Sequence, residues 1–317
     1  MKVLILLCLT LGALCNQQDL QQSYEAVKEN ASWESYDWQE NPFKDYSLDQ
    51  IKSLFGTTLM YDEHNIAMLI DNDDHSLADS LPTEFDARKQ WPGCISEVRQ
   101  QEHCGSCWAF SGSTTLADRF CVASNGKIKT VLSPQDFVSC DKSNYACQGG
   151  LLDKLWNYLE KSGIVEEKCF PYISGDGQNI PQCQNNVCAD GKETFTKFRA
   201  VIGSSKPLTC AAQIKQDLYK NGPIQTGFIV YEDFMHYKSG VYAYTHGKKL
   251  GGHAVKIIGW GVEAGNEYWI AQNSWGPAWG EDGFFRIKLG ECLFDSNGYA
   301  GLPNVADFSP NRFLFWE

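Results

Sequence analysis

After residue 15, the 317-residue chain has no apolar run long enough for a transmembrane helix, and it has no internal repeat or low-complexity tract. It is also poor in positive charge, with 27 Lys and Arg against 39 Asp and Glu. The resulting net charge of −12 argues against nucleic acid as a partner, because binding to phosphate groups depends on Lys and Arg. Hydrophobic residues make up 43% of the chain and charged residues 21%, which excludes a wholly disordered, collagen-like or coiled-coil protein.

The first fifteen residues have the pattern of a signal peptide. Lys2 precedes an apolar run from Val3 to Cys15 that is too short to span a membrane, and we expect cleavage before Asn16. The sequence therefore predicts a soluble product of the secretory pathway, either released from the cell or delivered to a lysosome or digestive vacuole. Eleven of the thirteen cysteines lie beyond this peptide. An oxidising compartment favours disulfides between them, and because their number is odd, at least one thiol is expected to remain.

Negative charge is concentrated near the N-terminus. Residues 16–80 contain 14 Asp and Glu against 3 Lys and Arg, whereas residues 81–317 contain 25 against 23. The first region is polar, with one short helix expected at 48–55 behind the N-cap Ser47, and it ends in an acidic linker at 71–79. From Leu81 onward the chain is rich in Trp, Gly and Cys. We therefore expect a separate N-terminal segment, residues 16–80, followed by the main domain, residues 81–317.

The main domain changes character along its length. Helical patterns come first, and short strands rich in aromatic and β-branched residues follow one last helix. A helical half followed by an antiparallel β half predicts an α+β protein with two lobes, and active sites favour the cleft between such lobes. The expected helices cover 106–121, 134 onward, 151–161 and 211–220, and the expected strands cover 224–231, 241–244, 253–260, 267–272 and 284–289.

The strongest local signal runs from Gln101 to Phe110 and contains Cys-Gly-Ser-Cys107-Trp. Cys107 is expected in the first turn of a helix, where backbone N–H groups and the helix dipole favour the thiolate. A nucleophilic thiolate also needs a base and a group that orients the base. His253, within Gly-Gly-His-Ala-Val, and Asn273, within Asn-Ser-Trp-Gly, are the candidates. His253 follows Cys107 by 146 residues, a separation typical of papain-type enzymes.

The residues alone leave other uses of this motif open. Cys104 and Cys107 form a CxxC pair of the redox type, but a thioredoxin-like βαβ pattern is missing. A metal site built on these two thiols and His103 is disfavoured, because no second CxxC and no HxxxH accompany them. His103 is the histidine nearest to Cys107 in sequence. We expect it in a loop at the rim of the cleft rather than as the base.

Taken together, these motifs resemble the papain family of cysteine proteases, and within it the cathepsin B subgroup. The resemblance runs from about Ser23 to Pro303 and implies a papain-like fold, with a helical lobe, an antiparallel β-barrel-like lobe and an active-site cleft between them. It also implies a monomeric hydrolase that acts on proteins or peptides without a cofactor or metal. Further motifs that carry it are Leu81-Pro82, Trp91 to Cys94, Asn221 to Pro223, Tyr237 to Tyr242 and Gly251 to Gly261.

The resemblance assigns four catalytic roles. Cys107 is the expected nucleophile, and His253 is the expected base that then protonates the leaving amine. Asn273 is expected to accept a hydrogen bond from the imidazole and hold its orientation. The side chain of Gln101 and the backbone N–H of Cys107 are expected to form the oxyanion hole.

Substrate contacts are implied on both sides of the scissile bond. Gly149 and Gly150 are expected to pair with the substrate backbone, because a side chain there would block its close approach. Trp275 is expected to cover the contact between His253 and Asn273 and to line the primed side. The pocket for the second residue before the scissile bond is expected to be lined by Leu151, Leu152, Gly227, Ala254 and Asn297.

The resemblance further implies four disulfides and leaves the pairing of Cys210 and Cys292 open. The implied pairs are Cys94 with Cys121, Cys104 with Cys147, Cys140 with Cys183, and Cys169 with Cys188.

Two departures from the cathepsin B subgroup change the expected activity. The subgroup has an occluding loop with two adjacent histidines that hold the C-terminal carboxylate of the substrate, whereas residues 170–182 form a short segment without histidine. We therefore expect an endopeptidase with a cleft open at both ends. Asn297 stands where the subgroup has a Glu that accepts Arg. A charge-assisted hydrogen bond of about 1.5–3 kcal/mol is lost, so apolar side chains are expected in the second subsite.

Residues 16–80 resemble a short inhibitory propeptide that runs backwards through the cleft, with residues 54–56 inserted there. Their carboxylates lose charge as the pH falls, so acid is expected to release the segment and to permit cleavage near Ser80 and Leu81. The expected protein is a cysteine-type endopeptidase made as a zymogen. The alternatives are a dipeptidyl carboxypeptidase of the cathepsin B type and a catalytically silent binding protein on the same fold.

Overall fold

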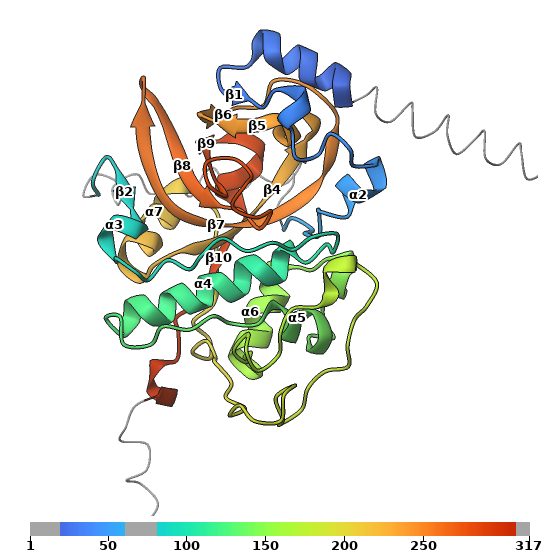
Figure 1. Cartoon of the computed structure of the whole chain (residues 1–317). Coiled ribbons are helices and arrows are strands. Elements are labelled where there is room, and N and C mark those ends of the chain that lie inside the picture. The colour runs from blue at the N-terminus through green and yellow to red at the C-terminus, as the bar shows by residue number, and fades with distance from the viewer. Residues whose placement is uncertain (1–19, 61–80, 309–317) are drawn as a thin grey trace, which may run out of the picture.

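The computed structural model describes residues 20–60 and 81–308, so the expected signal peptide and the expected cleavage site near Ser80 lie outside the described residues. The main domain forms two lobes that meet along helix α4 (Cys107–Ala123). One lobe consists mainly of helices and the other of a twisted sheet (Figure 1). Residues 20–60 lie on the outside of the sheet lobe and reach the boundary between the lobes.

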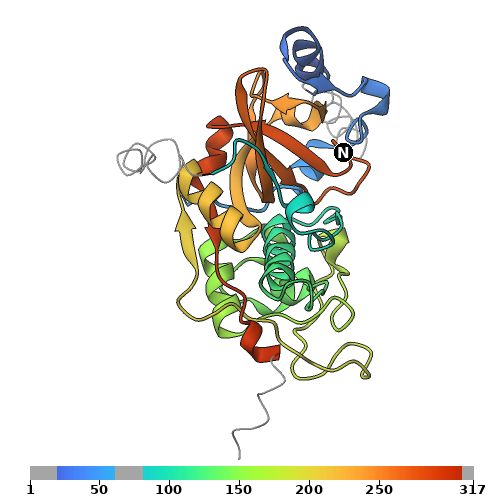
Figure 2. The same ribbon diagram turned by 90° about the vertical axis from the view of Figure 1, so that its left-hand side faces the viewer.

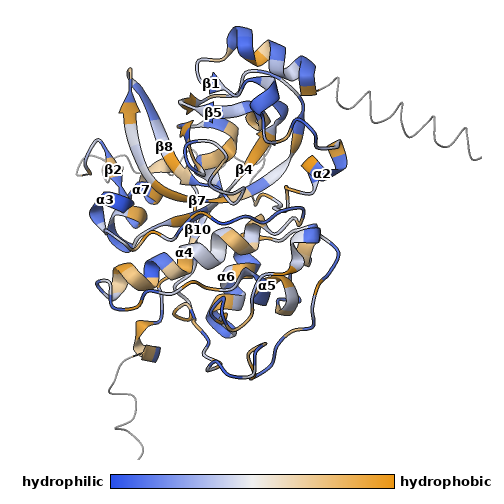
Figure 3. Ribbon diagram, viewed as in Figure 1, coloured by the Kyte–Doolittle hydropathy of each residue, from blue (hydrophilic) through white to orange (hydrophobic). Residues whose placement is uncertain are grey.

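Helix α4 forms although Gly112 to Thr115 are poor helix formers. A Cβ at Gly112 would lie only 2.6 Å from a methyl carbon of Leu155, so the glycine allows the next helix to pack closely. Ser111 and Thr114 donate hydrogen bonds to carbonyls of the preceding turn, at 2.7 and 2.9 Å. Tertiary packing therefore stabilises a helix that propensity alone disfavours. Figure 3 shows α4 largely in hydrophobic and intermediate colours, in contrast to the hydrophilic loops of the same lobe.

Two further helices complete the helical lobe. Helix α5 (Pro134–Cys140) begins as predicted, with the Ser133 hydroxyl accepting from the backbone N–H of Asp136 and proline in the first turn. Helix α6 (Leu152–Lys161) buries its predicted apolar face against α4. The buried residues of that face are Leu152, Leu155, Trp156 and Leu159. The 3₁₀ helices of the lobe and of the C-terminal region are η5 (Ala146–Gln148), η6 (Ser174–Asp176) and η9 (Val305–Phe308).

The sheet has the strand order β3-β10-β4-β7-β8-β9-β6, and β2 also pairs with β7. Its pairs are antiparallel, as predicted, except that β6 and β9 run parallel. Strand β7 extends beyond its predicted range because Gly251 and Gly252 continue the pairing with β4 instead of forming a turn. The strands are β2 (Phe85–Asp86), β3 (Lys206–Leu208), β4 (Ile224–Tyr231), β6 (Val241–Tyr242), β7 (Lys249–Glu263), β8 (Asn266–Gln272), β9 (Phe284–Lys288) and β10 (Gly298–Ala300).

The sheet lobe also contains one longer helix and several short helical elements. The predicted helix at 211–220 is α7 (Ala211–Asn221), and it packs on β7 and β4. Short elements complete the set, namely α3 (Ala87–Gln90), η7 (Glu232–His236) and η8 (Glu291–Ser296).

Buried polar contacts join the two lobes. Lys256 on β7 forms an ion pair with Asp118 on α4, and each side chain is only 1% exposed. Gln225 on β4 donates to the Trp108 carbonyl of α4 and accepts from the Trp156 indole N–H of α6, both at 2.8 Å. Because a buried polar group without a partner is costly, these contacts fix α4 relative to β7. Figure 2 looks nearly along α4 and shows the sheet on one side of it and the green helices α5 and α6 of the helical lobe on the opposite side.

The N-terminal segment, defined here as residues 20–60, docks on the sheet lobe partly through a two-stranded sheet to which each side contributes one strand. Residues 20–30 are helical, and strand β1 (Glu34–Ser35) pairs antiparallel with β5 (Tyr237–Ser239). The Trp33 side chain is 6% exposed and donates to the Ala243 carbonyl at 2.9 Å. The 3₁₀ helix η1 (Trp38–Glu40) and helix α2 (Leu48–Lys52) follow, and Ser47 and Gln50 cap α2 reciprocally.

Among residues 20–60 and 81–308, no helix combines the length and the apolar character needed to cross a membrane.

Candidate active site

Cys107 lies at the N-terminus of α4, and its side chain is completely buried. Burial raises the pKa of the Cys107 thiol, although the backbone of Ala254 and the Thr57 hydroxyl act in the opposite direction. The Thr57 Oγ1 atom lies 3.6 Å from the Cys107 Sγ atom. The N-terminal segment therefore covers this thiol and favours its neutral form.

His253 on β7 is held by the two residues that the sequence pairs with it. Its Nε2 atom lies 2.7 Å from Asn273 Oδ1, and its ring lies under the Trp275 ring with centroids 4.7 Å apart. Asn273 Oδ1 also accepts from the backbone N–H of Ser274, which orients the amide so that its oxygen faces the imidazole. Burial lowers the pKa of His253 to about 4, while the Asn273 hydrogen bond and the Leu54 backbone act against this shift. The imidazole is therefore neutral near pH 7 in this structure.

Gln101 is fully buried, and hydrogen bonds on both sides of its amide hold the side chain. Its Oε1 atom accepts from the Ser274 hydroxyl at 2.7 Å. Its Nε2 atom donates to the carbonyls of Cys104 and Leu54, both at 2.9 Å. Because Leu54 belongs to the N-terminal segment, one N–H of Gln101 points into the cleft at a carbonyl oxygen. This is the direction expected of an oxyanion-hole donor.

The N-terminal segment passes through the cleft at Gly56. A Cβ at this position would lie 1.8 Å from the Gly105 carbonyl oxygen, so only glycine fits. The Gly150 N–H donates to the Gly56 carbonyl at 2.7 Å, and Thr57 pairs with Gly150 in parallel orientation. A Cβ at Gly149 would lie 2.7 Å from the same Gly56 carbonyl oxygen. Of the two glycines expected to contact substrate backbone, Gly150 binds the backbone of the segment and Gly149 leaves room for it, and the segment expected in the cleft lies there.

Leu59 of the N-terminal segment lies at the expected second subsite and lines the same pocket as the residues expected there. The lining of this pocket includes Leu151, Leu152, Gly227 and Asn297, four of the five residues expected there. A Cβ at Gly227 would lie 2.8 Å from a Leu59 methyl carbon, so the glycine makes room for the leucine. The fifth residue, Ala254, is not part of this lining and pairs with Gly227 between β4 and β7. Asp153 on α6 adds a carboxylate to the wall that the sequence did not indicate.

Aromatic residues of the segment cover the other end of the cleft. Phe43 packs edge-on against Trp275 with ring centroids 5.3 Å apart, and Phe55 lies 6.1 Å from the His253 ring. Tyr46 lies against His103 at 5.3 Å. His103 is therefore a rim residue, as predicted.

The 3₁₀ helix η7 provides a docking surface that sequence reasoning missed. His236 is 1% exposed and packs against the rings of Tyr24 and Trp38, at 5.8 and 6.2 Å. Asn41 donates to its Nδ1 atom at 2.9 Å. Burial lowers the pKa of His236 to about 4. Because Asn41 and His236 are 195 residues apart, no local pattern could have paired them.

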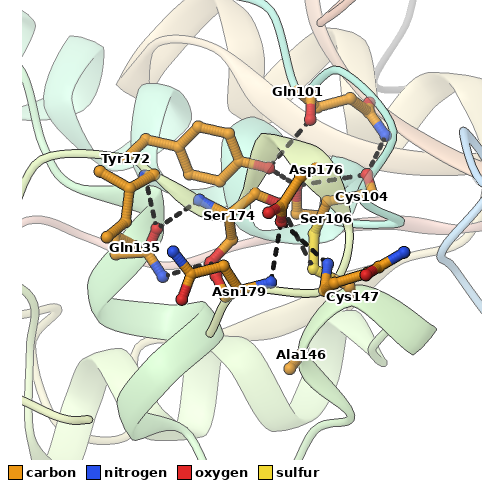
Figure 4. The surroundings of a disulfide bond; sticks show 12 residues. Gln101, Cys104, Ser106, Gln135, Ala146, Cys147, Tyr172, Ser174, Asp176 and Asn179 are labelled. Carbon is orange, nitrogen blue, oxygen red and sulfur yellow. Dashed lines mark hydrogen bonds between the residues drawn. A yellow bond between two sulfur atoms is a disulfide. The ribbon is translucent and has the colours of Figure 1, made fainter. Parts of the chain in front are cut away.

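The short segment 170–182 folds against the rim of the helical lobe (Figure 4). The Gly175 carbonyl accepts from the backbone N–H of His103 at 2.8 Å. Ser174 accepts from Gln135 on α5 and donates to the Asn179 carbonyl, at 2.9 and 2.8 Å. Asp176 accepts from two backbone N–H groups of the following turn. These contacts tie the segment to its own lobe.

The structure forms four disulfides, with the same pairs that the resemblance implies. Cys107, Cys210 and Cys292 remain thiols, so the last two do not bond to each other. Among the described residues, no group of three or more His, Cys, Asp or Glu side chains is arranged to hold a metal ion. The disulfides join Cys94 to Cys121, Cys104 to Cys147, Cys140 to Cys183 and Cys169 to Cys188.

Comparison with known proteins agrees with this geometry. The sequence profile of the papain family cysteine proteases matches residues 81–302. The chain belongs to this family and is a cysteine protease.

Within the family, the chain is similar to cathepsin B-like enzymes. It is 35% identical to cathepsin B-like cysteine proteinase 4 of Caenorhabditis elegans, over 90% of this chain and 93% of the relative. It is 46% identical to cathepsin B-like CP3 of Giardia intestinalis, over 71% and 75% of the two chains. The solved structure of procathepsin B S9 from Trypanosoma congolense matches with a TM-score of 0.75 and 31% identity, over 86% of this chain and 93% of that one. Together with the four disulfides, these similarities indicate a protein of the secretory pathway.

Proposed function

We propose that the chain is the zymogen of a cysteine endopeptidase, in which residues 1–15 are a signal peptide, residues 16–80 an inhibitory propeptide and residues 81–317 the mature enzyme. The observation that carries the proposal is the passage of the N-terminal segment through the cleft. Its Leu54 carbonyl accepts from Gln101, and its Gly56 carbonyl accepts from Gly150. A chain bound along the cleft in this way has its backbone held beside the Cys107 thiol.

Four residues carry the proposed chemistry. The Cys107 thiolate attacks the carbonyl carbon of the scissile bond, and the imidazolium of His253 protonates the leaving amine. Asn273 holds the imidazole orientation, and the Gln101 side chain with the Cys107 backbone N–H stabilises the oxyanion. Water then hydrolyses the acyl-thioester and regenerates the thiol.

Endopeptidase activity is supported by the segment 170–182. It carries no histidine, and its hydrogen bonds run to the helical lobe and within the segment itself. A dipeptidyl carboxypeptidase needs a cationic group to hold the substrate's terminal carboxylate, and this segment offers none. The N-terminal segment itself runs from Phe43 beside Trp275 to Leu59 beside the proposed second subsite, which supports a cleft open at both ends.

The second subsite is proposed to prefer apolar side chains. Leu59 of the N-terminal segment lies beside the proposed subsite, and Asn297, proposed as its base, is a neutral amide that is 3% exposed. The carboxylate of Asp153 on the same wall disfavours apolar side chains in this subsite.

Acidic release of the N-terminal segment is the proposed route of activation, with a lysosome, a digestive vacuole or the extracellular space as the site of action. The enzyme is proposed to act as a monomer.

The test uses the acid-activated chain and an internally quenched peptide blocked at both ends. Cleavage within the peptide, abolished by Cys107→Ala and by a thiol-directed epoxide, is the expected result. Release of dipeptides from a peptide with a free C-terminus, without cleavage of the blocked peptide, would instead establish a dipeptidyl carboxypeptidase. Absence of both activities, together with no labelling of Cys107, would favour a binding protein on this fold.

A further inference from the structure

Tyr172 makes two hydrogen bonds that connect separate parts of the proposed oxyanion hole (Figure 4). Its hydroxyl donates to the Gln101 backbone carbonyl at 2.9 Å, and the Ser106 hydroxyl lies 2.9 Å from the same oxygen. A tyrosine has one hydroxyl proton, and a carbonyl can only accept. The proton of Tyr172 therefore goes to Gln101, and Ser106 is the donor between the two hydroxyls. The Ser106 hydroxyl also lies 3.4 Å from the Cys104 carbonyl, a longer contact than the one to Tyr172.

These two partners flank the groups that are proposed to bind the oxyanion. Gln101 supplies the side-chain donor, and Ser106 directly precedes Cys107, whose backbone N–H is the second donor. The Ser106 side chain makes no capping hydrogen bond to α4, although serine is a preferred N-cap residue. Its hydroxyl is directed at Tyr172 instead.

Tyr172 is itself held in place by contacts away from the cleft. Its backbone N–H donates to Glu167 Oε1 at 2.9 Å, and Glu167 forms an ion pair with Arg99 at 2.7 Å. Its ring packs edge-on against Phe110 with centroids 4.7 Å apart. Burial raises the pKa of Tyr172, so the hydroxyl remains a protonated donor at every pH at which a protease of this kind acts.

We propose that Tyr172 is a positioning residue of the catalytic site, whose hydroxyl sets the spacing between the two oxyanion-hole donors. This inference rests on the function proposed above. The Leu54 carbonyl oxygen, 2.9 Å from Gln101 Nε2, marks the point at which the Gln101 donor is aimed. Without the Tyr172 hydroxyl, the Gln101 carbonyl and the Ser106 hydroxyl lose their common partner, and the hydrogen bond from the Gln101 side chain to the Cys104 carbonyl is left to set the distance between the two segments.

The effect is expected on the transition state rather than on substrate binding. An oxyanion exists only after the thiolate has added to the carbonyl, so a misaligned donor lowers kcat and leaves KM nearly unchanged. Complete loss of one such donor costs roughly 100- to 1000-fold in kcat. Because Tyr172 acts through its partners, we expect a smaller loss, on the order of tenfold.

The test compares the processed wild-type enzyme with Tyr172→Phe, which removes only the hydroxyl. Four quantities are measured: kcat, KM, the inhibition constant of a peptide aldehyde, and the rate of Cys107 alkylation by iodoacetamide as a function of pH. The aldehyde forms a tetrahedral adduct whose oxygen occupies the oxyanion hole, whereas alkylation generates no oxyanion. We expect kcat to fall about tenfold and the aldehyde to bind about tenfold more weakly, while KM and the alkylation profile change less than twofold.

Tyr158→Phe is the matched control. Tyr158 is another largely buried tyrosine of the helical lobe, and its hydroxyl donates to Asp136 at 3.2 Å, away from the proposed site. It is expected to keep wild-type kinetics. If Tyr172→Phe does not fold, Ser106→Ala removes the same link from its other end and keeps the ring packing. The same direction of change in kcat and aldehyde binding is then expected.

Unchanged kcat and aldehyde affinity in Tyr172→Phe would overturn the inference. So would an equal fall in the alkylation rate, which would indicate a general disturbance of the thiol. Failure of the proposed function looks different, because the wild-type enzyme itself would then cleave no peptide.

Discussion

At the residue scale, the N-terminal segment blocks the cleft to substrate and also changes the chemistry of the residues that it buries there. The pKa of the Cys107 thiol is raised and that of His253 is lowered to about 4, and desolvation is the largest cause in both cases. Both shifts oppose the thiolate and imidazolium forms that the proposed mechanism requires. Once the segment leaves, water reaches both groups, and the N-terminus of α4 favours the thiolate.

Asn297 gives a prediction at the same scale. Replacing it by Glu adds a carboxylate at the base of the proposed second subsite, which Asn297 lines together with Leu59. We expect Asn297→Glu to raise kcat/KM for peptides with Arg at the second position before the scissile bond by about 10- to 100-fold, because a charge-assisted hydrogen bond contributes about 1.5–3 kcal/mol.

Asn297→Gln, which adds length without charge, is the control for that measurement and should show no such gain. An Asn297→Glu enzyme that still discriminates against Arg as the wild type does would contradict the assignment of Asn297 to the pocket base. A wild-type enzyme that already prefers Arg would point to Asp153 as the recognising carboxylate.

At the element scale, the passage of the N-terminal segment through the cleft depends on a close contact between glycines of the segment and of the main domain. Gly56 lies between Gly105 and Gly149, and a Cβ on it would overlap the Gly105 carbonyl at 1.8 Å. Gly105 cannot retreat easily, because its N–H donates to the Cys147 carbonyl at 3.0 Å and the neighbouring Cys104 is bonded to Cys147. The enzyme side of this contact is rigid, so the segment must adapt.

Gly56→Ala is therefore expected to lift the segment out of the cleft. The intact chain carrying this change should be alkylated by iodoacetamide at Cys107 at least tenfold faster than the wild type at pH 7. Thr58→Ala, which removes an exposed side chain from the same stretch, should behave as the wild type. Equal protection of Cys107 in Gly56→Ala and in the wild type would show that the crossing tolerates a side chain.

At the scale of the whole molecule, a titrating residue lies between the N-terminal segment and the sheet lobe. The sequence leads us to expect ion pairs of acidic residues at this contact. The pair between Glu34 and Lys238 is of this kind, but it lies at the surface, where such pairs contribute little. His236 lies in the buried part of the contact. The acidic groups on its own turn are engaged elsewhere, Glu232 by the Lys248 backbone and Asp233 by Tyr242.

The pH dependence of docking follows from His236. Its pKa is about 4 when docked, against 6.5 ordinarily, and the neutral ring accepts from Asn41, which a protonated ring cannot do. The undocked form thus takes up the proton first. Docking is strongest above pH 6.5 and weakens as the pH falls from 6.5 toward 4, by about 3 kcal/mol over the full range.

His236→Gln keeps a side-chain acceptor that does not titrate, and it should flatten this response. We expect the alkylation rate of the intact wild type, relative to the processed enzyme, to rise at least tenfold between pH 6.5 and pH 4.5, and that of His236→Gln to rise less than threefold. Glu34→Gln, which removes the exposed pair, should keep the wild-type response. A wild-type rise of the alkylation rate in His236→Gln would contradict this account. It would indicate that the carboxylates control the pH dependence of docking.

Much of the element pattern could be predicted from the sequence because it is set locally. Strand β4 begins and ends as predicted, and α5 begins at the predicted cap, since alternation, capping and proline position are properties of neighbouring residues. Strands β1 and β5 were not predicted. Each has two or three residues, and they stabilise each other across about 200 positions of the chain.

The sequence by itself determined the family, the two-lobed α+β class and the residues proposed for catalysis, because cysteine, histidine and glycine signals of this kind lie in short motifs whose chemistry depends on residue type and order. Only the tertiary structure decided what surrounds these residues. It placed Leu59 and Asp153 along the wall of the proposed second subsite, packed Asn41 on His236, and joined Gln101 to Ser106 through Tyr172. Such contacts join side chains that are far apart in sequence, and burial and hydrogen-bond geometry, which select them, exist only once the chain has folded.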